Sequence, residues 1–170
     1  MCKNAGFTLI ELFIVIALMT ILAAIAIPNF TIWVSNYRLK DASFGIRSVM
    51  QAARVAAVKE RNYVVVSFDA ANNSYIAFVD NGAGTGGTRD NQVRDGDEKI
   101  IKTGNMPSGV DLYEAAFSTG SRTRFNSRGY PTLMGSVYMK NDKSKYHKVI
   151  LSKAGHSRIE KSSDGVNWSR

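Results

Sequence analysis

The sequence predicts an α+β protein in which a long, kinked N-terminal helix packs on an antiparallel β-sheet head domain. Three patterns predict this fold. Residues 7–27 form an almost uninterrupted apolar run, about as long as an α-helix must be to cross a bilayer. A stripe of apolar residues at helical spacing follows, as far as about Glu60. From Asn62 onward the hydrophobic period becomes two, which is typical of half-buried strands.

The apolar run contains a single charged residue, Glu11. Its Leu, Ile, Phe and Val side chains favour membrane insertion by about 6 kcal/mol in sum, whereas one acidic residue opposes insertion by about 3 kcal/mol. The run is therefore predicted to insert as a helix. Glu11 still needs a partner that neutralises its charge.

Three interpretations of the N-terminal region compete. A conventional signal peptide would be cut at the small-x-small site Ala24-Ile25-Ala26 and would release a secreted β-domain. A simple signal anchor would keep the whole run. Neither accounts for Glu11. In the third interpretation the chain is cut after Gly6, and the new ammonium group of Phe7 lies about one helical turn from Glu11.

The segment Gly6-Phe7-Thr8-Leu9-Ile10-Glu11, followed by the apolar run and Pro28, resembles the class III signal of type IV pilins and type II secretion pseudopilins. The resemblance implies that residues 1–6 are a leader peptide and that a prepilin peptidase cuts between Gly6 and Phe7 and methylates the Phe7 amine. It also implies that Glu11 pairs with the Phe7 amine of a neighbouring subunit during assembly. A carboxylate buried in oil is tolerated when a cation lies within about 4 Å.

The same resemblance implies a location and a set of partners. The expected location is the bacterial inner membrane, crossed once with the head in the periplasm, and afterwards a pilus or pseudopilus. The expected partners are other pilin or pseudopilin subunits, the prepilin peptidase and an inner-membrane assembly platform.

The helix is predicted to have two parts, residues 7–28 in the membrane or filament core and residues 29–61 as an amphipathic continuation. Pro28 removes a backbone donor and clashes with the preceding turn, so a kink or a locally melted stretch is expected there. The apolar stripe of the continuation consists of Ile32, Leu39, Ala42, Ile46, Val49, Ala53 and Ala56. We interpret this stripe as part of the head core.

Residues 62–170 are predicted to form the β-rich globular head. Short strands are expected at 62–69, 74–80, 99–102, 109–115, 123–127, 136–140, 146–152 and 157–161, with a hairpin turn at 70–73. The stretches TRFNSRGYP and YHKVILSKAGHSRIE resemble the closing strands of GspH/FimT-type minor pilins. This second resemblance implies a non-catalytic minor pilin or pseudopilin, a structural subunit whose head selects its partners.

The formal charge of +8 lies entirely in residues 120–170, which contain eleven basic and three acidic residues. One-sided charge of this kind attracts polyanions. Some FimT-like pilins take up DNA through a glycine-arginine-x-arginine turn, so a DNA-binding competence pilin is an alternative function. The corresponding residues here are Gly155 and Arg158, with Lys153 and Lys161 beside them, but His156 replaces the first arginine.

No catalytic residues, metal site or cofactor are predicted. His147 and His156 form no recognisable metal set. Gly82, Gly84 and Gly87 spell G-x-G-x-x-G, but the residues that follow carry no apolar stripe, so the helix of a dinucleotide site is not expected. We interpret residues 81–97 as a mobile loop. Four acidic residues could offer oxygen ligands to calcium, although their spacing matches no standard loop: Asp90, Asp95, Asp97 and Glu98.

Overall fold

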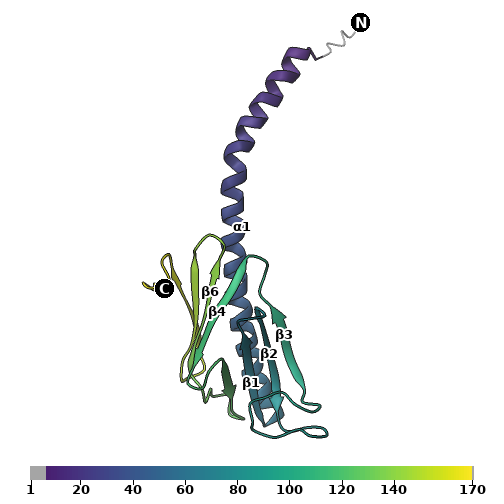
Figure 1. The fold of residues 1–170 in the computed structure, drawn as a ribbon, viewed down its shortest axis with the longest axis vertical. Helices are drawn as coiled ribbons and strands as arrows, with labels where there is room; N and C mark the ends of the chain where they lie inside the picture. The colour runs from purple at the N-terminus through teal and green to yellow at the C-terminus, as the bar shows by residue number, and fades with distance from the viewer. Residues whose placement is uncertain (1–6, 170) are drawn as a thin grey trace. The chain divides into compact units, whose positions relative to one another are not determined.

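The computed structural model describes residues 7–169, which form one helix followed by eight strands (Figure 1). Helix α1 is Leu9–Glu60. The strands are β1 Tyr63–Asp69, β2 Ser74–Asp80, β3 Ile100–Asn105, β4 Val110–Phe117, β5 Arg122–Phe125, β6 Gly135–Asn141, β7 Tyr146–Leu151 and β8 Ser157–Ser162. The chain divides into two compact units, the first ending at Val34 and the second beginning at Ser35.

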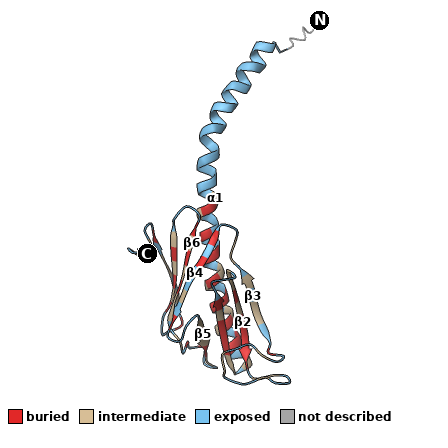
Figure 2. Cartoon of the chain, in the orientation of Figure 1, coloured by how far each residue is buried: buried red, intermediate tan, exposed pale blue. Residues whose placement is uncertain are grey.

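In the first unit the helix buries nothing. Residues 7–33 are all exposed (Figure 2), and α1 is long and apolar enough near its start to cross a membrane. The helix continues through Pro28 without a melted stretch, and the expected kink stays a prediction. Two side chains supply hydrogen bonds around the proline: Asn29 Nδ2 donates to Ile25 O at 3.1 Å and Thr31 Oγ1 donates to Pro28 O at 2.8 Å.

In the second unit the rest of α1 supplies one wall of the head core. The predicted stripe is confirmed from Leu39 to Ala56, whereas Ile32 lies in the first unit and is 45% exposed. The face also buries Ser35, Ser43, Met50 and Ala57. The helix ends at Glu60 as predicted, and Arg61 adopts a left-handed φ of 52°, a common conformation after a helix end.

All eight predicted strands are present, and they form two four-stranded antiparallel sheets. The first sheet has the order β3-β2-β1-β5 and the second β4-β6-β7-β8. The α+β fold is as expected, but the sequence did not predict the division into two sheets. The predicted hairpin turn joins β1 to β2, where the Asp69 carboxylate accepts from Asn72 N at 3.1 Å and from Asn72 Nδ2 at 2.7 Å.

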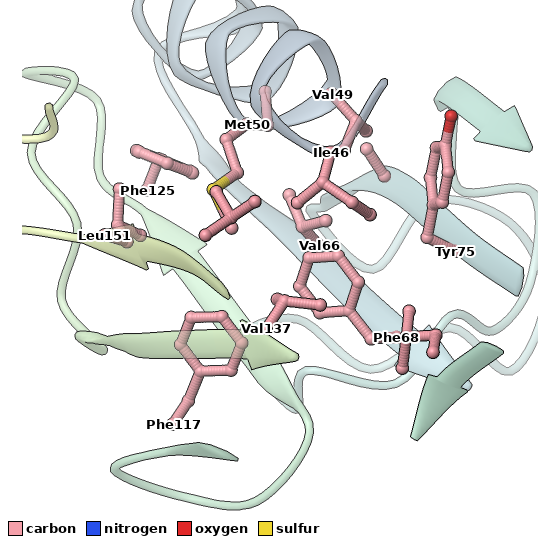
Figure 3. Packing of buried hydrophobic residues seen from close by; sticks show 14 of the residues in the cluster. Ile46, Val49, Met50, Val66, Phe68, Tyr75, Phe117, Phe125, Val137 and Leu151 are labelled. Carbon is pink, nitrogen blue, oxygen red and sulfur yellow. The ribbon is translucent and has the colours of Figure 1, made fainter. Parts of the chain in front are cut away.

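A single hydrophobic cluster joins the helix to both sheets. Figure 3 shows Ile46 and Met50 of α1 among side chains of the two sheets, with Val66 from the first and Leu151 from the second. Phe68 of β1 and Phe117 of β4 stack with ring centroids 5.6 Å apart and connect the sheets directly. The helix and the two sheets therefore share one close-packed core.

A buried histidine forms a hydrogen bond between the second sheet and the helix. His147 on β7 was expected to be a strand or surface histidine, and it is a strand residue with little exposure. Its Nδ1 lies 2.7 Å from Ser43 Oγ. Because the Ser43 hydroxyl donates to Leu39 O at 2.8 Å, its oxygen is the acceptor for the Nδ1–H. Burial, and to a smaller extent the charge of Lys161, lower the pKa of His147 to about 4.

The head should lose stability when the pH falls from about 6.5 to about 4. In this range the histidine of the unfolded chain takes up a proton whereas His147 in the fold does not, so acid favours unfolding by up to about 3 kcal/mol. Urea unfolding of wild type and His147→Gln at several pH values tests this. The free energy of unfolding of His147→Gln should depend less on pH than that of wild type. The same change at exposed His156 should leave the wild-type pH dependence. Equal slopes for wild type and His147→Gln would contradict the assignment.

Candidate functional site

The first turn of α1 is closed by a hydrogen-bonded pair of side chains. Thr8 N and Thr8 Oγ1 both donate to Glu11 Oε2 at 2.8 Å, and Glu11 N donates back to Thr8 Oγ1 at 3.3 Å. This reciprocal arrangement is a capping box, which satisfies backbone donors that a helix start leaves free. Sequence reasoning missed it, although Thr-x-x-Glu before an apolar run is its signature.

The capped carboxylate lies at the start of an apolar surface. Phe7 is 92% exposed, and the helix exposes apolar side chains from Leu9 to Phe30. Among residues 7–169, both hydrogen bonds that the Glu11 carboxylate accepts use Oε2, so Oε1 can accept from a further donor. Gly6 lies outside the described residues, so of the two residues at the predicted cleavage junction the structure describes only Phe7. Chemically, the site presents one anion within a surface that suits lipid or other apolar helices.

The glycine of the predicted DNA-binding turn has a packing role. Gly155 is buried after β7 with a φ of 78°, and its carbonyl lies at hydrogen-bonding distance, 3.5 Å, from Arg54 Nη1. A Cβ at this position would be 3.4 Å from Arg54 Cζ and from the carbonyl of Gly129. The left-handed backbone conformation therefore disfavours a side chain here, although a Cβ would make contacts of ordinary length. Lys153 is exposed in the same turn.

The structure does not bring the four predicted DNA-binding residues onto one surface. Arg158 and Lys161 lie on β8 three residues apart, so their side chains leave opposite faces of the strand. Arg158 Nη2 is 3.0 Å from Glu160 Oε1, so its charge already has a partner. DNA binding stays a prediction.

The glycine-rich segment after β2 is a loop, as expected, with no helix or strand between Asn81 and Lys99. Its glycines therefore lack the helix of a dinucleotide site. Two carboxylates that flank it hold its backbone. Glu98 accepts from Gly82 N at 2.9 Å and from Asp95 N at 3.3 Å, and Asp80 Oδ2 accepts from Gln92 N at 2.9 Å. No three His, Cys, Asp or Glu residues within 7–169 are grouped so that they could hold a metal ion.

The Asp80 carboxyl is in an unfavourable environment. Asp80 is fully buried and Glu98 is 1% exposed. Asp80 Oδ1 has no hydrogen-bond partner among the described residues. Burial, followed by the charges of Glu98 and Asp90, raises the pKa of Asp80 above its ordinary value. The charged form of Asp80 thus costs stability near neutral pH.

Asp80→Asn should stabilise the head at pH 7 by about 1 kcal/mol, because the amide keeps the acceptor for Gln92 N and removes a buried charge. A raised native pKa means that wild-type stability falls as the pH rises through it. The advantage of the variant should therefore shrink as the pH approaches 4. Urea unfolding of wild type and variant at pH 7 and near pH 4 measures this difference in the free energy of unfolding. Asp95→Asn is the control: this carboxylate accepts from Thr88 N and Asn91 Nδ2, and its replacement should not stabilise. A less stable Asp80→Asn protein would contradict the account.

Two family models match the chain. The model described as Type II transport protein GspH matches residues 45–155, from the buried half of α1 through β7. The model described as Prokaryotic N-terminal methylation motif matches residues 1–27.

Sequence relatives include pilus proteins. A fimbrial protein of Pseudomonas aeruginosa is 32% identical over 127 residues, which cover 72% of this chain and 82% of that protein. The type IV major pilin PilA of Myxococcus xanthus is 44% identical over 52 residues, which cover 31% of this chain but only 24% of the pilin.

Solved structures with the same fold include two minor subunits. The minor pseudopilin EpsH of the Vibrio cholerae type II secretion system aligns with a TM-score of 0.52 at 12% identity, over 72% of this chain and 95% of that chain. The type IV minor pilin FimU of Pseudomonas aeruginosa aligns with a TM-score of 0.53 at 11% identity, over 81% and 97%. At these identities the likeness concerns the fold.

Proposed function

This chain belongs to the GspH family of type II transport proteins, and we propose that it is a minor subunit of a type IV pilus or type II secretion pseudopilus. Proteins of this kind are structural, and no catalytic role is proposed. One observation carries the proposal: the helical surface of residues 7–33 is exposed and apolar, with a single carboxylate near its start.

Two environments can cover an apolar helical surface of this length. Lipid covers it before assembly, and the apolar helices of neighbouring subunits cover it in a filament. The charge of Glu11 distinguishes the two, because a carboxylate in hydrocarbon is costly unless a cation pairs with it. The proposed cation is the N-terminal ammonium group of Phe7 in an adjoining subunit.

Phe7 carries an N-terminal ammonium group only after the peptide bond between Gly6 and Phe7 has been cut. We propose that a prepilin peptidase cuts between Gly6 and Phe7 and that the new amine is methylated. The match of the methylation motif to residues 1–27 supports this proposal. The subunit would wait in the inner membrane with its head in the periplasm until an assembly platform adds it to the filament.

The mature chain should begin at methylated Phe7. Mass spectrometry of the intact protein and of its N-terminal peptide, purified from membranes of the native host, measures this directly. Inactivation of the prepilin peptidase should leave residues 1–6 attached. A mature chain that begins at Ile27 would instead indicate the secreted β-domain, and an unprocessed chain in wild-type cells would rule out the class III leader.

Replacement of Glu11 separates its two roles. Glutamine can keep the capping box with Thr8 but carries no charge, whereas alanine removes both. If the ion pair drives recruitment, both variants should insert in the membrane normally and both should be at least tenfold depleted from sheared filaments, measured by immunoblot against membrane levels. Thr8→Ala, which keeps the carboxylate and removes one capping partner, is the control. Normal recruitment of Glu11→Gln would show that helix capping, and not charge, is what assembly needs.

A further inference from the structure

The second sheet carries aromatic side chains on the face that points away from the core. Three of them lie on strands, Tyr113 on β4, Tyr138 on β6 and Tyr146 on β7, and Trp168 follows β8. Tyr113 lies 6.1 Å from Tyr138 and 6.2 Å from Tyr146, and Tyr138 lies 5.7 Å from Trp168, all between ring centroids. We call these four residues the aromatic face. None of them belongs to the buried core cluster.

The segment after β8 fixes one end of the aromatic face. The Asp164 carboxylate accepts from Ser162 Oγ at 2.6 Å, from the backbone of Val166 and Asn167, each at 2.9 Å, and from Asn167 Nδ2 at 2.7 Å. This turn brings Trp168 over Lys148, with Nζ 4.6 Å from the ring centroid. The rings are thus held in place, which lowers the entropy cost of binding a ligand against them.

A pocket of about 300 Å³ adjoins the other end of the aromatic face. Its lining includes Gly109, Asp111, Lys140, Asp142, Ser144 and Tyr146. Tyr146 belongs to both pocket and aromatic face, and Lys140 Nζ lies 5.9 Å from the Tyr113 ring. Gly109 has a φ of 79°, and its missing Cβ would lie 3.9 Å from the Asp142 carboxyl, so a side chain there would enter the space beside Asp142.

The charges around this pocket are balanced. Lys140 Nζ is 3.8 Å from Asp111, and Lys143 Nζ is 3.5 Å from Asp142. Along the aromatic face, Lys148 is paired with Glu160 at 2.9 Å. A polyanion would have to compete with these carboxylates for each of the three lysines. A neutral ligand with several hydroxyl groups can instead donate to the aspartates and accept from the lysine and from Ser144.

We propose that this pocket binds one hexose unit of a neutral glycan, with the sugar ring against Tyr113 and Tyr146 and its hydroxyls on Asp111, Lys140 and Asp142. Aromatic rings offer a flat apolar surface to the C–H face of a sugar, and neighbouring donors and acceptors match vicinal hydroxyls. This activity goes beyond subunit assembly and does not depend on it, because every residue of the pocket lies in the second unit.

The test uses the full processed chain in lipid nanodiscs, which avoids sugar-based detergents. Saturation-transfer NMR detects binding of cellohexaose and chitohexaose, with single-stranded (dT)20 as a competing class of ligand. Binding of a hexaose with a Kd of about 1 mM or tighter is expected, at the strength of a single-pocket ligand. Tyr113→Ala and Asp111→Asn should each weaken it at least fivefold.

Tyr130→Ala is the matched control, since Tyr130 is 52% exposed, compared with 38% for Tyr113, and lies outside the pocket and the aromatic face. It should bind like wild type. Binding of neither hexaose at about 10 mM, or binding that survives both Tyr113→Ala and Asp111→Asn, would overturn the proposal. Binding of (dT)20 in place of the hexaoses, lost in Tyr113→Ala, would overturn it in favour of a nucleic-acid face.

Discussion

The head depends on the second half of α1, because that half of the helix is the wall against which both sheets complete their core. The contact is tight at small residues such as Ala42 and Ala53, which leave room for the strands, and it is filled by large ones such as Ile46 and Met50. The sole cysteine of the chain is Cys2, so no disulfide reinforces the head. If the helix detached, both sheets would lose their common surface. Hydrophobic packing alone keeps the helix in place.

Local patterns in the sequence were sufficient to predict the elements, but not their partners. The change of hydrophobic period after Glu60 marks the end of the helix, and alternation marks each strand. The assignment of β1 and β4 to different sheets depends on pairings between distant segments, such as Val66 with Thr123, which no local pattern contains. The capping box at Thr8 and Glu11 was missed, although the Thr-x-x-Glu spacing is sufficient to predict it. The burial of His147 and the pairing of Arg158 with Glu160 require the register between strands.

The basic C-terminal region, residues 120–170, illustrates how folding pairs charges that the sequence keeps apart. Eleven cations against three acids suggest one positive surface. In the fold, Glu160 pairs with both Lys148 and Arg158, and Asp111, from outside residues 120–170, lies beside Lys140. Since alternate residues of a strand leave opposite faces, Arg158 and Lys161 on β8 point to different sides of the second sheet. Net charge in sequence therefore overstates the field that a polyanion would meet.

The shared helix also determines when the head can complete its fold. Ser43 and its partner His147 are 104 residues apart, so the ribosome releases the buried face of the helix long before the strands that cover it. During that interval the uncovered apolar stripe follows directly after the apolar run of residues 7–27, which favours a lipid environment. Charged residues on other faces of the same helix make its insertion into the bilayer unfavourable. They are Arg38, Lys40 and Arg47. These charges keep the unfinished stripe in water, where the late strands can reach it.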